Sequence, residues 1–155
     1  MELEAFELLS ILLSALVLGV FWGPWVGLTR SIHTFTPVVF LAIAQRLNLN
    51  LAPLMTVLMP ASLLSILPVL YLSYKSLPIT FDLSLSALAL FLVALLVTVL
   101  VEVPISKLTL IWTTATLPED WPKRRDRWGA FHIVRIVSAF VGLALLVSGI
   151  VFQQK

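Results

Sequence analysis

The chain has 155 residues with a formal net charge of +2; 60% of its residues are apolar and only 12% are charged. A water-soluble domain carries about 45–50% apolar and about 25% charged residues, so this composition excludes a soluble globular fold and indicates that the bilayer is the solvent. The absence of cysteine excludes disulfides, thiolate metal sites and a cysteine nucleophile.

Four stretches are long and apolar enough to cross a bilayer, which takes about 20 residues. They are residues 8–28, 51–74, 83–103 and 129–152. The acidic start of the chain is unlike a secretory signal, so the first stretch is interpreted as a retained helix. Pro53, Pro60 and Pro68 predict a bend in the second. We therefore expect an all-α fold, in which residues 1–155 form one integral membrane domain built as a four-transmembrane-helix bundle.

Two of the connections have helical features. Thr36 followed by Pro37 is a favourable N-cap and first turn. The apolar run 37–47 is too short to cross a bilayer, so we expect a short interfacial helix after the first span. The long connection 104–128 is expected to form a basic loop and helix before the fourth span, with Trp121 and Trp128 at the headgroups.

The basic residues are divided unequally between the two sides of the predicted bundle. Both termini and the second connection share one side, which carries Lys75 and Lys155. The other side carries seven: Arg30, Arg46, Lys107, Lys123, Arg124, Arg125 and Arg127. The bias predicts cytoplasmic loops 29–50 and 104–128 and outward termini, in a plasma or inner membrane. The expected partner is the lipid bilayer. Nucleic-acid binding is not expected, because so short a membrane-tethered loop offers no fold for it.

Small residues recur at every fourth position of the first span, at Ala15, Gly19, Gly23 and Gly27. Such a stripe lies on one helix face and lets another backbone approach closely, so it predicts a helix–helix contact in the bundle or with a partner. Alternatively, with Trp22 and Trp25 beside it, the stripe could form a smooth wall for a flat ligand.

Two helical stripes of polar residues predict a pocket. A charge inside a span costs about 2.5–3.5 kcal/mol and is usually paired or functional. At spacings of 4, 4, 3 and 4, one stripe comprises Thr98, Glu102, Ser106, Thr109 and Thr113. At spacings of 4, 4 and 3, the other comprises Arg124, Trp128, His132 and Arg135. Because the third and fourth helices are antiparallel neighbours, we expect a polar pocket around Glu102, His132 and Arg135.

The cluster of Glu102, His132 and Arg135 has more than one possible interpretation. It could be a structural ion pair between Glu102 and Arg135, a functional pocket, or side chains that snorkel to the interface. A metal site of Glu102, His132 and His33 is possible in principle. No HxxxH or ExxH spacing supports it, so no metal is predicted.

The residues from the third span to the fourth resemble the anthrone oxygenase-like family of small four-helix membrane proteins. The resemblance rests on Val101-Glu-Val-Pro-Ile-Ser106, Trp112, Pro118-Glu-Asp-Trp121, Arg125, Arg127-Trp128, His132 and Arg135, together with the glycine-rich first helix. Members of the family usually carry asparagine where this chain has Glu102 and Ser106, and both differences fall in the predicted pocket.

The resemblance implies a cofactor-free oxygenase that acts on a flat aromatic or quinone-like compound. His132 or the desolvated Glu102 would be the base, and Arg135 would hold the enolate. Ser106 and Arg124 would contact the substrate, and Trp22, Trp25 and Trp128 would form the walls. Two other classes stay open: an accessory subunit of a membrane complex, docked through Gly19, Gly23 and Gly27, and a carrier of a lipid-soluble compound.

Overall fold

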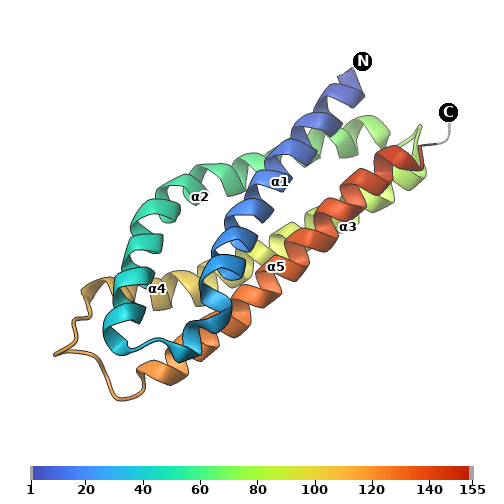
Figure 1. Cartoon of the computed structure of the whole chain (residues 1–155). Coiled ribbons are helices and arrows are strands. Elements are labelled where there is room, and N and C mark those ends of the chain that lie inside the picture. Colours follow the sequence, from blue (N-terminus) through green and yellow to red (C-terminus); the bar gives the residue numbers. More distant parts are fainter. Residues whose placement is uncertain (1, 154–155) are drawn as a thin grey trace.

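Helices form nearly all of the structure, a computed structural model that describes residues 2–153. Within that range no residue belongs to a strand, which confirms the all-α fold class. In chain order the elements are α1 (Glu2–Gly27), the 3₁₀ helix η1 (Thr29–Thr34), α2 (Pro37–Ser73), α3 (Pro78–Val97), the π-helical turn η2 (Thr98–Glu102), α4 (Val103–Ile111) and α5 (Trp121–Val151). Figure 1 shows their arrangement.

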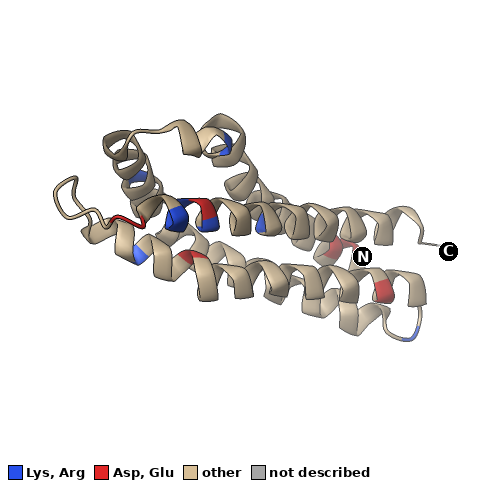
Figure 2. Cartoon of the chain, turned by 90° about the horizontal axis from the view of Figure 1, so that it is seen from below, with Lys and Arg blue, Asp and Glu red and all other residues tan. Residues whose placement is uncertain are grey.

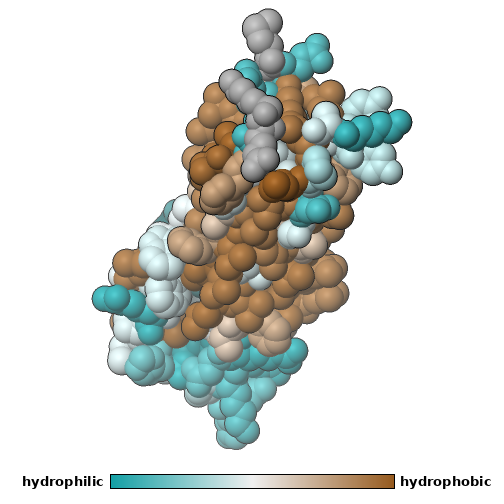
Figure 3. All heavy atoms as spheres, turned by 90° about the vertical axis from the view of Figure 1, so that its right-hand side faces the viewer, coloured by the Kyte–Doolittle hydropathy of each residue, from teal (hydrophilic) through white to brown (hydrophobic). Residues whose placement is uncertain are grey.

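Four helical stretches are long and apolar enough to cross a membrane. They are Glu2–Thr34, Pro37–Ser73, Pro78–Ile111 and Trp121–Val151. Large apolar side chains such as Val57 and Leu100 are exposed on the outside of the bundle. Figure 3 shows that such residues form an apolar belt between two more hydrophilic ends. A belt of this kind is stable only against lipid, so the chain is a multi-pass membrane protein.

Both chain ends lie at the same end of the bundle, together with the α2–α3 turn (Figure 1). The opposite end carries η1 and the α4–α5 loop, and we call it the basic end. Figure 2 shows that most of the Lys and Arg residues lie toward this end. Lys75 lies in the turn at the other end, and Lys155 lies outside the described residues.

Residues 37–47 do not form the separate interfacial helix that the sequence predicts. They are the first turns of α2, which begins after Thr36, whose Oγ1 accepts a bond from the backbone N–H of Val39. Gln45 and Asn48 fall within the predicted connection 29–50, but they lie in α2, and their side-chain amides donate hydrogen bonds to backbone carbonyls of α4 and its C-cap. Gln45 donates to the carbonyls of Thr109 and Trp112, at 2.9 and 3.0 Å. Such C-terminal carbonyls lack partners within their own helix, so α2 supplies them.

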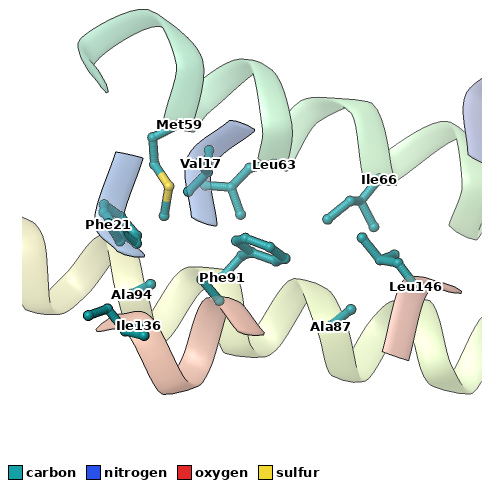
Figure 4. Close-up of a cluster of buried hydrophobic side chains, with 11 residues drawn as sticks. Val17, Phe21, Met59, Leu63, Ile66, Ala87, Phe91, Ala94, Ile136 and Leu146 are labelled. Carbon is teal, nitrogen blue, oxygen red and sulfur yellow. The ribbon is translucent and has the colours of Figure 1, made fainter. Parts of the chain in front are cut away.

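A hydrophobic cluster at the centre of the bundle joins α1, α2, α3 and α5 (Figure 4). Its fully buried members include Val17, Ile66 and Phe91. The tightest approach lies between α3 and α5, where a methyl group added at Gly142 would meet the Phe91 ring at 2.9 Å. Gly142 therefore sets the separation of these two helices, because a larger residue there would push against a ring with no room to move.

The third span changes its winding at η2. The backbone N–H of Val103 bonds to the carbonyl of Thr98, five residues earlier, where an α-helix would use the fourth. Pro104 follows directly and has no N–H with which to continue the α-helical ladder. A wider turn of this type inserts one residue into the helix and is frequent at functional sites. Glu102 is the last residue of this turn and the only one that is fully buried.

Candidate functional site

Glu102, His132 and Arg135 meet inside the bundle toward the basic end. Each is at most 8% exposed. Arg135 Nη1 donates to Glu102 Oε2 at 2.8 Å, and His132 Nδ1 lies 4.0 Å from the same oxygen. The ion pair joins α5 to η2, so the antiparallel neighbours bring together the three side chains as the two stripes predict.

The imidazole of His132 has a defined orientation. Its Nε2 lies 3.1 Å from the main-chain carbonyl oxygen of Phe21 in α1. A carbonyl can only accept, so Nε2 carries the hydrogen, and the neutral ring then has its lone pair on Nδ1. That nitrogen is turned toward Glu102 but has no hydrogen-bond partner among the described residues. The site therefore holds a histidine whose basic nitrogen is unoccupied.

Aromatic rings hold the imidazole and the guanidinium. Trp128 is one turn before His132 on α5, and their rings stack with centroids 5.1 Å apart and planes 8° apart. The guanidinium carbon of Arg135 lies 4.1 Å from the ring centroid of Phe21, a distance at which the ring face attracts the cation. These contacts restrict the rotamers of both side chains, which pre-organises the polar group.

These side chains line a cavity of about 400 Å³, within the range of small-molecule sites. Its apolar wall comes mainly from α2 and includes Leu51, Met55 and Met59. Its polar wall comes from η2, α4 and α5. Thr98, Glu102, Ser106 and Thr109 of the first predicted stripe line it, and so do Trp128, His132 and Arg135 of the second. Thr113 lies beyond the end of α4.

The buried polar atoms without partners are concentrated at this cavity. Among the described residues, four such side-chain atoms lack a hydrogen bond: Thr29 Oγ1, Glu102 Oε1, His132 Nδ1 and Arg135 Nε. All four residues line the cavity. Leaving a buried polar atom unpaired costs about 1–3 kcal/mol, so four in one place suit the polar end of a ligand better than a purely structural role.

Three predicted ligand contacts are not brought to the cavity, since none of them lines it. Trp22 and Trp25 are close to each other on α1, with ring centroids 5.3 Å apart; Trp22 is exposed, and Trp25 packs against the central cluster. Arg124 pairs with Asp120 at 2.9 Å in the exposed first turn of α5. Helical spacing placed Arg124 on the same face as His132, but two turns of helix separate them along the axis.

The glycine stripe of α1 is not used for packing within this chain. Among the described residues, a methyl group added at Gly19, Gly23 or Gly27 would have no atom within 4 Å apart from the nearby backbone of its own helix. The close helix contact of the bundle is instead made at Gly142 and at Gly149, where the added methyl would lie 3.7 Å from Thr80. These glycines are seven residues apart, on one face of α5. No helix contact at this pair is predicted from the sequence.

Two site residues gave no sequence signal. Thr29 reads as an ordinary residue of a polar connection, yet it is 4% exposed and its hydroxyl has no partner among the described residues. Phe21 contributes a main-chain carbonyl and a ring face, and neither can be inferred from its type. Also within the described range, no three His, Asp or Glu side chains gather as a metal site. The cofactor-free reading remains a prediction.

Residues 35–145, well over half of the chain, match the model of a protein family described as "Anthrone oxygenase". The chain belongs to the anthrone oxygenase family. The matched range contains Glu102, Ser106, Trp128, His132 and Arg135, whereas α1, with Trp22 and the glycine stripe, precedes it. Comparison with curated proteins and with solved structures gives no match. The family match confirms the resemblance, and it falls on the elements that build the polar wall of the cavity.

Proposed function

We propose that this protein is a cofactor-independent oxygenase that converts a flat, apolar carbon acid of the anthrone type into the corresponding quinone. The observation that carries the proposal is the set of unpaired buried atoms at one apolar cavity: a lone pair on His132, an oxygen of Glu102 and an N–H of Arg135. A base, an anion and a cationic donor are what such a reaction needs.

The geometry favours His132 over Glu102 as the base. The Glu102 carboxylate is paired with the Arg135 guanidinium through Oε2, with Oε1 unpaired, whereas the His132 ring is neither part of an ion pair with a cation nor free to turn, because Nε2 bonds to Phe21 and leaves Nδ1 without a partner. When Nδ1 takes a proton, the new N–H faces the Glu102 carboxylate 4.0 Å away. That charge stabilises the imidazolium, as the acidic member of a catalytic triad does.

The reaction proceeds by removal of a proton, addition of O₂ to the carbanion and loss of water. The base breaks a C–H bond of the methylene, and the electron pair spreads to the carbonyl oxygen as an enolate. The Arg135 Nε–H supports this enolate. The carbanion reduces O₂ and forms a C–O bond, and the peroxide recovers the proton from His132. Cleavage of the O–O bond with loss of the remaining C–H proton releases water and leaves the second carbonyl. Anthrone and O₂ thus give anthraquinone and water.

The test uses protein reconstituted in lipid vesicles, with anthrone as the substrate. Oxygen uptake and anthraquinone absorbance are followed above the spontaneous oxidation seen in protein-free vesicles. His132→Gln removes the basic nitrogen and should lower the catalysed rate by at least about 100-fold. His33→Gln is the matched control, because His33 is exposed and does not line the cavity. Full turnover by both His132→Gln and Glu102→Gln would refute the proposal.

We further propose that the basic end faces the cytoplasm, in a plasma or inner membrane. Seven basic residues in the segments 29–50 and 104–128, against Lys75 and Lys155 in the rest of the sequence outside the spans, support this orientation. The cysteine-free chain allows a direct measurement with Thr114→Cys and Ser76→Cys. In intact cells, an impermeant maleimide should label the second and not the first. The reverse pattern would contradict the orientation.

The oxygen-uptake assay and a co-purification experiment separate the two alternatives. A carrier would bind anthraquinone and release it without oxygen uptake. An accessory subunit would use the uncovered face of Gly19, Gly23 and Gly27 to contact a helix of a partner protein. It would then purify with that partner in mild detergent, and a Gly23→Leu variant would lose the partner while keeping its fold.

A further inference from the structure

The lining of the cavity is exposed along only one strip. Most lining residues are buried or half-buried, and the exposed ones lie on two facing elements. They are Ala52, Thr56 and Pro60 on α2, and Val99 and Val103 on η2 and α4. We call these five residues the lateral mouth. The lateral mouth therefore lies between the third span and α2, which is bowed in Figure 1.

The lateral mouth offers no free polar side chain. Thr56 is its only polar member, and the Thr56 hydroxyl donates to the carbonyl of Ala52 within the same helix, at 2.8 Å. The side chains of this opening therefore offer no free group to hold water or to select a charged solute, and their apolar surface is suited to contact with hydrocarbon.

The basic end below the cavity is closed. A second hydrophobic cluster, made of Ile32, Phe40, Leu41 and Trp112, fills the space between η1, α2 and the start of the loop. The ring of Phe40 stacks on that of Trp121 with centroids 5.2 Å apart. The side-chain amides of Gln45 and Asn48 donate to the carbonyls of Thr109 and Ser106 in α4, which also line the cavity. A route from the aqueous loops would have to break these contacts.

The position of the mouth along the helices places it in the hydrocarbon region. Val103 and Val99 precede Lys107 by four and eight residues, and Thr56 follows Arg46 by ten. At about 1.5 Å per residue these offsets are about 6, 12 and 15 Å from the charged residues that mark the basic end. The opening thus lies above the headgroups of that leaflet and below the bundle centre.

We propose that the substrate is dissolved in the bilayer and enters the site sideways, through the lateral mouth, from the leaflet at the basic end. The proposal rests on the proposed function for the identity of the ligand and extends it to a substrate class. That class is a flat, uncharged, lipid-soluble ring system with hydrogen-bonding groups at one end. The rings would lie along the apolar α2 wall, and the polar end would face Glu102, His132 and Arg135.

Engineered cysteines at the mouth test the route, because the chain has no native cysteine. Thr56→Cys and Val99→Cys in vesicles are compared before and after modification with N-cyclohexylmaleimide. Anthraquinone is then delivered from donor vesicles, and its loading is followed by quenching of tryptophan fluorescence, since Trp128 lines the cavity. Modification should slow loading at least tenfold. Val57→Cys and Leu100→Cys are matched controls, because these neighbours face outward without lining the cavity.

A second measurement needs no ligand. A nitroxide attached at Thr56→Cys or Val99→Cys should be relaxed more by oxygen, which concentrates in lipid, than by a water-soluble nickel chelate. Stronger relaxation by the nickel chelate than by oxygen would overturn the proposal. So would equal rates of anthraquinone loading in the modified mouth variants and the modified control variants. An acyl chain that native mass spectrometry finds in the cavity and that anthraquinone does not displace would also overturn it. So would the absence of any anthraquinone binding.

The two proposals fail in different ways. If modification at the mouth slows loading but His132→Gln leaves turnover intact, the lateral route stands and the proposed chemistry fails. If His132→Gln abolishes turnover but a modified mouth loads normally, the chemistry stands and the route fails.

Discussion

The Nε2 hydrogen of His132 is donated across the bundle to the main-chain carbonyl of Phe21, 111 residues earlier in the chain. This contact ties α5 to α1 and fixes which nitrogen is basic. A glutamine at this position can place its amide nitrogen near Nε2, whereas an asparagine is too short. We therefore expect His132→Gln to keep the stability of the native protein and lose turnover, and His132→Asn to lose both. Unfolding in bicelles and oxygen uptake measure the two effects, and equal stability of both variants would contradict this role of the Phe21 bond.

The buried pair between Glu102 and Arg135 predicts a strongly non-additive stability effect. Glu102→Leu leaves a buried cation without its partner and should cost about 3–5 kcal/mol of unfolding free energy. Adding Arg135→Met should restore most of it, because both charges are then gone. The exposed Arg124–Asp120 pair is the control, and Asp120→Asn should cost at most about 1 kcal/mol. If the change in unfolding free energy of the double variant equalled the sum of the changes in the single variants, the two charges would not be coupled.

Glycines on two helices should respond oppositely to substitution by alanine. At Gly142 the new methyl would lie 2.9 Å from the buried ring of Phe91, so Gly142→Ala should destabilise the bundle by about 1–3 kcal/mol. At Gly23 no atom lies within 4 Å. Gly23→Ala should be neutral or stabilise the helix by up to about 1 kcal/mol, as alanine favours a helix. Thermal unfolding of the two variants, compared side by side, measures the difference. A stable Gly142→Ala protein would mean that α3 and α5 can separate at low cost.

The hydrogen bonds that the side-chain amides of α2 donate to α4 should control the access of water to the site. Asn48 Nδ2 donates to the carbonyl of Ser106 at 3.1 Å, beside the two bonds from Gln45. Removing these donors in Gln45→Ala/Asn48→Ala takes the side-chain donors from the carbonyls of Thr109 and Trp112 at the end of α4, while the Ser106 carbonyl keeps the hydroxyl of Thr109. Hydrogen–deuterium exchange in 103–112 should then become faster. Asn50→Ala, an exposed change two residues away, should leave exchange as it is. Unaltered exchange in the double variant would argue against closure of the basic end by these bonds.

Much of the architecture was predictable because hydrophobic length and helical spacing are local properties. Four apolar stretches gave the four spans, and two polar stripes brought Glu102 to His132 and Arg135. Spacing along one helix does not say how far along its neighbour a residue lies, so the stripe places Arg124 at a pocket that it does not line. A stripe of small residues likewise cannot indicate whether a helix covers it.

Other features depended on partners distant in the sequence. Gln45 and Asn48 fall within the predicted connection 29–50, and their hydrogen bonds to α4 help to explain why α2 continues through them. The hydroxyl of Thr29 and the carbonyl of Phe21 join the site through the fold alone. Tertiary contacts of this kind leave no periodic pattern in the sequence.

Because Glu102 ends the π-helical turn Thr98–Glu102, the position of its carboxylate depends on the number of residues in that turn. A turn with one residue more than the α-helical number can lose one residue and become an ordinary helix. Each residue of an α-helix advances about 100° around the axis. Deletion of Leu100 or Val101, which do not line the cavity, would thus preserve a membrane-spanning helix while changing the position of the Glu102 carboxylate relative to α3. Evolution could silence or restore such a site by length variation alone, with every side chain of the cavity still encoded.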